Sequence, residues 1–142
     1  MKSNSDNPRI GKDFQKMVLE RLELFFDRRF QMETPIPIGD PPKDHRFDCV
    51  SEDRKIVAEC KCYTWTDTGN IPSAKLMGLN EALFYMSYLP EETIKILCVK
   101  RAEYPTKKET LAEYYCRIDA HLLRDVKVFE IDDYGNIRII KE

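Results

Sequence analysis

Residues 46–63 read RFDCVSEDRKIVAECKCY, and this stretch decides the predicted fold of the 142-residue chain. Two runs rich in apolar and β-branched residues, 46–50 and 55–63, flank the polar segment 51–54. Apolar runs on either side of a short polar turn predict an antiparallel β-hairpin. We expect this hairpin to carry the chemistry of the protein.

One face of the second strand carries a carboxylate and an ammonium group. Side-chain alternation sends Glu59 and Lys61 to that face and Cys60 to the other. On the first strand, Asp48 lies near the end remote from the turn, and ten residues separate it from Glu59. An antiparallel register can bring these two carboxylates within a few ångströms of each other.

Two carboxylates that close, in a partly buried site, repel each other unless a proton or a cation intervenes. We expect Asp48 and Glu59 to hold Mg²⁺, with Mn²⁺ as a substitute, and the backbone carbonyl of Cys60 to supply a further oxygen ligand. Lys61 is then placed to orient or activate water, or to stabilise charge in the transition state. The alternative is a solvated face or a weak salt bridge, since Glu-x-Lys is common on surface strands.

The rest of the chain predicts a mixed α/β domain around the hairpin. Apolar residues at helical spacing indicate three helices, and the continuous apolar run 93–99 is typical of a central strand buried on both faces. The predicted order is α-β-β-β-α-β, then α-β-β, in a single domain over residues 1–142 with residues 1–9 loose. The expected helices cover 11–29, 72–90 and 107–124, the expected strands cover 32–38, 46–50, 55–63, 93–99, 126–131 and 137–140, and residues 39–43 form a loop.

Composition places limits on the partners and the compartment. The chain is 42% hydrophobic and 34% charged, as globular proteins are, and its formal net charge of −2 means that any DNA contact must be local. No run of about 18 apolar residues is present, so we expect a cytoplasmic protein that does not bind a membrane.

The five cysteines are an odd number without paired C-x-x-C spacing, which indicates reduced core thiols. Zinc bound by Cys60, Cys62 and a histidine is the alternative, but structural zinc sites usually take their ligands from turns.

The segment after the second hairpin strand, residues 63–75, is rich in hydroxyl, aromatic and amide groups. It predicts a substrate-facing loop in which Tyr63 and Trp65 contact the substrate and Ser73 and Lys75 meet a phosphate at a helix start. The alternative is a hydrogen-bonded turn with Trp65 packed on the core. His45, three residues before Asp48, is a further candidate for substrate contact or water activation.

Other residues are weaker candidates for these roles. The basic pairs Lys100-Arg101 and Lys107-Lys108 could form a phosphate-contacting rim, with a solvated surface as the alternative. His121 is predicted to be structural.

Asp48, ten intervening residues and Glu59-Cys60-Lys61 together resemble the signature of the PD-(D/E)XK nuclease superfamily, which includes restriction endonucleases, Holliday-junction resolvases and repair nucleases. The resemblance spans about residues 10–100. It implies a restriction-endonuclease-like αβββαβ core with a mixed central sheet flanked by helices, here followed by a C-terminal α-β-β extension. It also implies that Asp48 and Glu59 are metal ligands and that Lys61 is the catalytic lysine.

Two positions depart from the family pattern. Family members often add a carboxylate from the first helix, after a phenylalanine, and here Gln15 follows Phe14 in that catalytic slot. This departure argues against a strong second metal site, and Glu20 is an alternative donor. The residue before the family aspartate is often proline, whereas Phe47 stands there in this chain.

The resemblance and the residues together predict a metal-dependent endonuclease that hydrolyses phosphodiester bonds in DNA, working as a homodimer or with a partner subunit. The rival hypothesis is a catalytically inactive module with the nuclease fold that binds nucleic acid or a protein. The sequence leaves open duplex, branched or damaged DNA or RNA as the substrate, and restriction, repair or resolvase roles.

Overall fold

The computed structural model describes residues 8–65, 73–105 and 108–142. A single sheet contains six strands in the spatial order β1-β2-β3-β4-β5-β6, which is also their order along the chain. The pairs β1–β2, β2–β3 and β5–β6 are antiparallel, whereas β3–β4 and β4–β5 are parallel. The strands are β1 (Phe30–Ile38), β2 (Lys43–Ser51), β3 (Ile56–Lys61), β4 (Ile94–Lys100), β5 (Lys127–Ile131) and β6 (Ile137–Lys141), and the helices are α1 (Pro8–Phe26), α2 (Ser73–Met86), α3 (Leu111–Ile118) and α4 (Ala120–Leu123).

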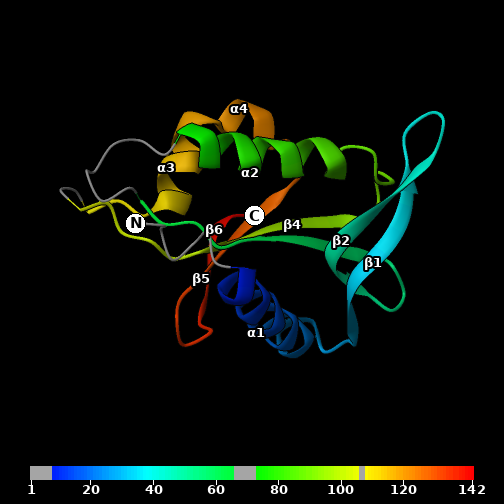
Figure 1. Ribbon diagram of the computed structural model, residues 1–142, viewed down its shortest axis with the longest axis horizontal. Helices are drawn as coiled ribbons and strands as arrows, with labels where there is room; N and C mark the ends of the chain where they lie inside the picture. The colour runs from blue at the N-terminus through cyan, green and yellow to red at the C-terminus, as the bar shows by residue number, and fades with distance from the viewer. Residues whose placement is uncertain (1–7, 66–72, 106–107) are drawn as a thin grey trace.

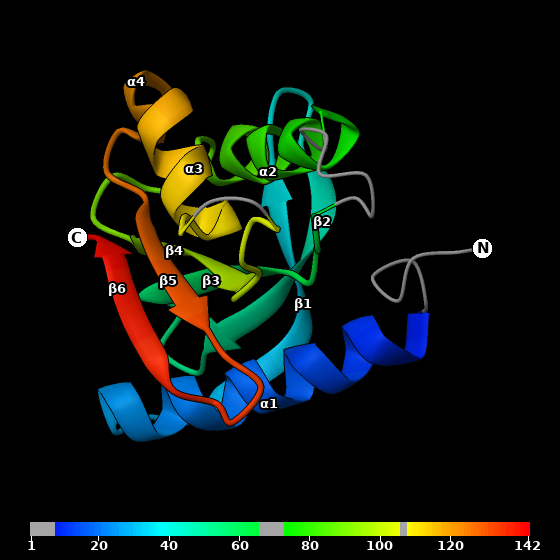
Figure 2. The ribbon, with the colours of Figure 1, turned by 90° about the vertical axis from the view of Figure 1, so that its left-hand side faces the viewer.

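The molecule has three layers (Figure 1). Helix α1 covers one face of the sheet, and α2, α3 and α4 cover the other, as the second view also shows (Figure 2). Parallel neighbours need a connection that crosses a sheet face, which α2 supplies between β3 and β4 and α3 with α4 supply between β4 and β5. The predicted α/β class, with a mixed sheet flanked by helices, is confirmed.

The core has one part on each side of the sheet. On the α1 side, Phe14 and Val18 pack against strand residues that include Ala58. On the α2 side, Leu79 packs against strand residues that include Val57. Strand β4 is buried over Lys95–Val99, between β3 and β5, as predicted for the run 93–99. Side chains of β3 and β4 therefore leave the sheet into packed protein on both faces.

Helix α1 begins earlier and ends earlier than predicted. Pro8 opens the helix, a position where proline is favoured because its missing N–H would be unpaired there anyway. The prediction that residues 1–9 are loose is therefore wrong for Pro8 and Arg9, and residues 1–7 lie outside the described part. Within the described residues, no helix is both long enough and apolar enough to cross a membrane.

Strand β1 is an edge strand, which explains its prolines. Pro35 and Pro37 lie two residues apart, so both lack an N–H on the same side of the strand, where an edge strand has no neighbour to bind. Glu33, in the same strand, has a left-handed backbone with φ of 50°. A non-glycine residue rarely adopts this conformation inside a strand, so β1 is locally distorted at Glu33.

The third predicted helix is two helices. The expected helix over 107–124 begins only at Leu111, because Thr110 is its N-cap: the Thr110 side chain accepts the Glu113 N–H and the Glu113 carboxylate accepts the Thr110 N–H. The chain then breaks at Asp119, which caps the end of α3 and precedes α4. Residue 107 lies outside the described part.

The capping box yields a stability prediction. Thr110→Ala leaves the Glu113 N–H without its hydroxyl acceptor, so the free energy of unfolding should fall by about 1 kcal/mol. Thr110→Ser keeps the acceptor and should retain most of the stability. Urea unfolding followed by circular dichroism measures both variants, and equal losses in the two would show that the buried methyl group, not the cap, is what matters.

Candidate metal-binding and catalytic site

Strands β2 and β3 stop pairing as a regular ladder just where the predicted site begins. The paired residues are Cys49 with Ala58 and Val50 with Val57. Beyond Cys49, side-chain carboxylates replace backbone carbonyls as the acceptors for main-chain N–H groups. The two strands remain bridged at this point through side chains.

Asp48 and Glu59 form a reciprocal bridge between the strands. The Asp48 N–H donates to Glu59 Oε1 at 3.0 Å, and the Cys60 N–H donates to Asp48 Oδ2 at 2.7 Å. Each carboxylate thus accepts a main-chain N–H of the opposite strand, and each uses one of its two oxygens in the bridge. Both groups are held by main-chain amides that the strands themselves position.

Glu59 and Lys61 leave β3 on the face covered by α2. Their alternation partners Ala58 and Cys60 pack with the α1 side of the core, and Val57 packs with the α2 side. The Glu59 side chain is only 7% exposed, and Asp48 and Lys61 are half-buried. A carboxylate this far from water is rare unless it is paired, protonated or bound to a cation.

Burial makes the pair reluctant to carry two negative charges. Burial and then the charge of Asp48 raise the pKa of Glu59 to about 8, against the opposing effects of the Asp48 N–H and Lys61. Burial also raises the pKa of Asp48, although the Cys60 N–H and Lys61 favour its ionised form. Near neutral pH the two acids therefore hold a proton in the absence of a cation.

His45 lies beside Glu59 without forming an ion pair with it. Its Nε2 lies 3.8 Å from Glu59 Oε2, and its ring stacks on Tyr85 of α2 at 3.9 Å between centroids and contacts Phe47 edge-on. Burial lowers the pKa of His45, so a neutral imidazole faces a protonated Glu59. His45 Nε2 is buried and has no hydrogen-bond partner among the described residues.

The donor set suits a divalent cation with oxygen ligands. Among the described residues, Asp48 Oδ1 and Glu59 Oε2 accept no hydrogen bond, so one oxygen of each acid is free to coordinate. The described part of the chain contains no group of three or more His, Cys, Asp or Glu side chains placed to hold a metal. One or two carboxylates with water and substrate oxygens are the usual ligands of Mg²⁺.

Lys61 is the last residue of β3 and lies at the edge of the site. Its Nζ is 6.0 Å from the centre of the Tyr63 ring, within the range of a cation–π contact. The Tyr63 ring in turn rests against α2 at Gly78, where a β-carbon would come within 2.5 Å of the tyrosine hydroxyl. Tyr63 therefore fixes the distance between α2 and the end of β3, and it supports Lys61.

Gln15 contacts the site through the backbone. This buried residue of α1 donates its side-chain amide to the Asp48 carbonyl at 2.9 Å. Gln15 therefore contacts the backbone of Asp48, and its amide holds β2 against α1.

The predicted substrate contacts Trp65, Ser73 and Lys75 have different surroundings in the structure. Trp65 is 7% exposed, its indole N–H donates to the Ala102 carbonyl, and its ring packs against Tyr104, so the structure favours the packing alternative. Ser73 opens α2 and is exposed, and Lys75 Nζ donates to the Thr64 carbonyl at 3.3 Å. Residues 66–72 of the predicted loop lie outside the described part.

The predicted basic rim is largely engaged with acids. Lys100 pairs with Asp133, and Arg101 pairs with Glu130 and Glu103. Lys107 lies outside the described residues.

Cys60 and Cys62, the zinc alternative, both pack on the α1 side of the core, and all five cysteines are free thiols. Burial raises the pKa of Cys62, which disfavours the thiolate that zinc requires.

Sequence reasoning missed three residues around the site. After burial and Asp48, the Glu81 carboxylate on α2 also contributes to the raised pKa of Glu59, and it opposes the lowering of the His45 pKa by burial. Glu33 lies between residues that pair with Cys49 and Phe47, across from Asp48, and pairs with Lys12. Glu81 and Tyr85 are one helical turn apart, a spacing visible in the sequence, although only the fold shows which way they face.

Comparison with protein-family models, with curated proteins and with solved structures gave no significant match.

The raised pKa of Glu59 predicts how stability changes with pH. Between its ordinary pKa and about 8, the folded protein keeps a proton that the unfolded chain has lost, so the free energy of unfolding falls as pH rises through this range. The slope can reach about 1.4 kcal/mol per pH unit and flattens above the folded pKa.

Glu59→Gln removes this titration and should flatten the slope, making the variant more stable than the wild type near pH 8. Urea unfolding in the presence of a chelator, at several pH values, measures the effect. Glu52→Gln, in the exposed hairpin turn, is the matched control and should keep the wild-type slope. An unchanged slope in Glu59→Gln would mean that Glu59 is ionised in the folded protein.

Proposed function

We propose that this protein is a metal-dependent endonuclease of the PD-(D/E)XK type that hydrolyses phosphodiester bonds in DNA. The observation that carries the proposal is the reciprocal bridge of the half-buried Asp48 and the buried Glu59, which keep one oxygen each for a cation. Lys61 beside them supplies the third residue of the signature.

The site residues have distinct tasks in this hydrolysis. Asp48, Glu59 and the Cys60 carbonyl would hold Mg²⁺, which when bound supplies positive charge to the phosphate oxygens and to water. Lys61 orients the attacking water and stabilises negative charge that builds on the phosphate. Water attacks phosphorus in line with the leaving sugar oxygen, and the products are a phosphate monoester and a free hydroxyl.

The order of the secondary-structure elements also supports the proposal. The resemblance implies the order α-β-β-β-α-β, and the elements from α1 to β4 follow that order around a mixed sheet. The end of β3 that carries Lys61 is also the carboxyl end of a strand in the parallel part of the sheet, where α/β proteins usually bind ligands.

A second candidate is a binding module that keeps this fold without catalysis. The observation in its favour is that the carboxylates of Asp48 and Glu59 already bind main-chain amides, and that Gln15 brings an amide, not an acid, to the site. In that case the acids stabilise the strand ends. The two functions differ in whether a divalent cation binds.

We predict that the wild type binds one divalent cation at Asp48 and Glu59. Titration calorimetry with Mn²⁺ or Mg²⁺ should show one site, and Asp48→Asn should weaken binding at least about tenfold by removing a ligand charge. Asp44→Asn, an exposed acid on the same strand, should not weaken it.

Because the pKa of Glu59 is about 8, binding near pH 7 should also release about one proton, which buffers of different ionisation enthalpy reveal. Binding that persists in Asp48→Asn would place the cation elsewhere.

We predict that DNA cleavage depends on Lys61. With Mg²⁺ or Mn²⁺, the wild type should nick supercoiled plasmid or cut labelled branched DNA, and Lys61→Met should cut at least about a hundredfold more slowly. Lys55→Met, an exposed lysine just before β3, is the control and should cut like the wild type. Cation binding should survive in Lys61→Met.

If the wild type binds DNA but cuts neither DNA nor RNA with either cation, the binding-module function is the better one. A protein that neither binds a cation at Asp48 nor contacts DNA would overturn both functions.

A further inference from the structure

A cavity lined by both polar and apolar residues lies on the α2 side of the sheet, and it does not include Asp48 or Glu59. Its volume is about 670 Å³, and it opens between α2, α4 and the start of β4. Ligand pockets typically measure about 300–1,000 Å³. None of Asp48, Glu59, Lys61 and His45 lines it. The cavity is therefore a separate candidate site that the proposed function does not use.

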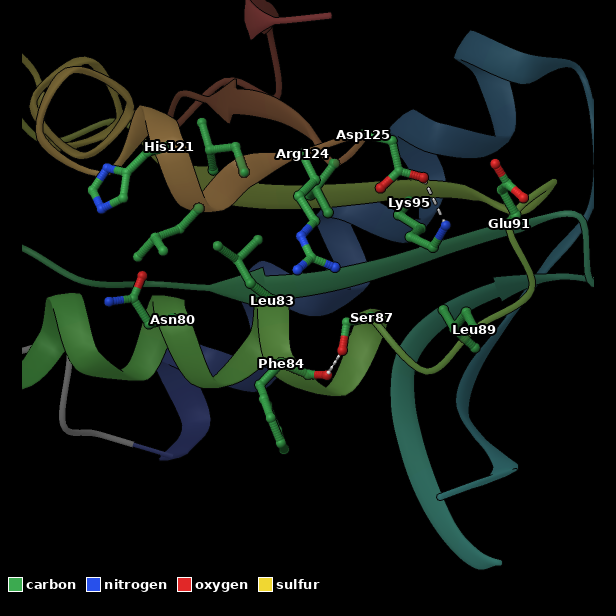
Figure 3. Close-up of a pocket in the computed structure, with 13 residues that line it drawn as sticks. Asn80, Leu83, Phe84, Ser87, Leu89, Glu91, Lys95, His121, Arg124 and Asp125 are labelled. Atoms are coloured by element: carbon green, nitrogen blue, oxygen red, sulfur yellow. Dashed lines mark hydrogen bonds and ion pairs between the residues drawn. The ribbon is translucent and has the colours of Figure 1, made fainter. Parts of the chain in front are cut away.

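A buried lysine forms part of the cavity wall. Lys95 leaves β4 on the same face as Leu97, at a position where an apolar residue would complete the core, and its side chain is 4% exposed. Its ammonium donates to Asp125 at 2.9 Å (Figure 3). It also donates to the Thr93 carbonyl at 3.4 Å. An ammonium group has three protons, so one remains for a further acceptor.

Arg124 is the second cation of the cavity. Its side chain points from the end of α4 toward Leu83 and Ser87 of α2 (Figure 3). Within the described residues its guanidinium forms no ion pair, unlike that of Arg101, Arg117 or Arg138. Its backbone has φ of 51° and ψ of −122°, a conformation that favours glycine. The Arg124 side chain places a bidentate donor in the lining of the cavity, beside α2.

Two apolar residues of the cavity lining are partly open to solvent. Phe84 is 62% exposed and Leu122 is 42% exposed, although both line the cavity. His121 stands at the same rim, and its ring can add a further donor. The lining acids are Asp125, already paired with Lys95, and Glu91 at the α2–β4 turn.

We propose that this cavity binds a small organic anion, with its carboxylate, phosphate or sulfonate group on Arg124 and Lys95 and its apolar ring or chain against Phe84 and Leu122. Arg124 and Lys95 both line this cavity, and its partly exposed apolar residues offer surface that a ligand body would cover. Charge-assisted bidentate contacts from arginine are among the stronger polar contacts in proteins. Specificity for an anion then depends mainly on Arg124.

Two matched probes test the proposal. Anilinonaphthalene sulfonate joins an aromatic body to an anionic group, and phenylnaphthylamine has a similar body without the charge. The wild type should bind the sulfonate saturably at one site, with shifts of the Ser87 and Arg124 amide signals in nuclear magnetic resonance spectra. Arg124→Gln should weaken sulfonate binding about tenfold and change binding of the neutral probe by less than about twofold.

Two further variants keep the result interpretable. Arg124→Gly removes the guanidinium and also relaxes the backbone, so it should lose sulfonate binding without losing thermal stability. Arg29→Gln removes an exposed arginine just after α1 and should bind like the wild type. Equal sulfonate affinity in wild type and Arg124→Gln, equal affinity of the wild type for the two probes, or signal shifts elsewhere would overturn the proposal.

Discussion

The end of the β2–β3 ladder is the constraint on which the candidate site depends. A regular ladder would bind the Asp48 and Cys60 amides to main-chain carbonyls and leave the acids free to turn toward water. Instead the carboxylates of Asp48 and Glu59 accept these N–H groups, so each acid is fixed by the opposite strand. The same hydrogen bonds that hold the strands together also keep the acids in a poorly solvated place.

This arrangement creates an electrostatic conflict that the protein alone resolves only by holding a proton. Lys61 favours the ionised form of both acids, yet burial is the larger influence on each. His45 adds no positive charge to the site, because burial lowers the pKa of its imidazole. Sites where neighbouring groups push pKa values this far are often functional, and a cation is the ligand that would relieve this one.

Much of the fold follows from local sequence pattern. The hairpin over 46–63, the alternation that separates Glu59 from Cys60, and the buried run 93–99 depend on neighbours in sequence, and all three are observed. The start of α3 has a local signal that the predicted start at residue 107 missed, because Thr110 and Glu113 have the spacing of a capping box.

The surroundings of the site depend instead on how α2 is rotated. This helix is apolar on more than one side, with Leu79 and Met86 buried and Met77 and Phe84 exposed. Helical spacing alone therefore identifies no single buried stripe, and the contact of Tyr85 with His45 could not be predicted. The left-handed backbone of Glu33 has no local signal either, since a glutamate rarely adopts this conformation inside a strand.

Helix α2 contributes residues both beside the paired acids and in the cavity that contains Lys95. Tyr85 stacks on His45 beside the paired acids, while Leu83 and Ser87, on neighbouring turns, line the cavity that contains Lys95. In the parallel register Lys95 lies beside Val57 and Lys61 lies beside Val99, so the two lysines mark opposite ends of the same pair of strands. Packed core separates these ends, and α2 contributes residues to the surroundings of both.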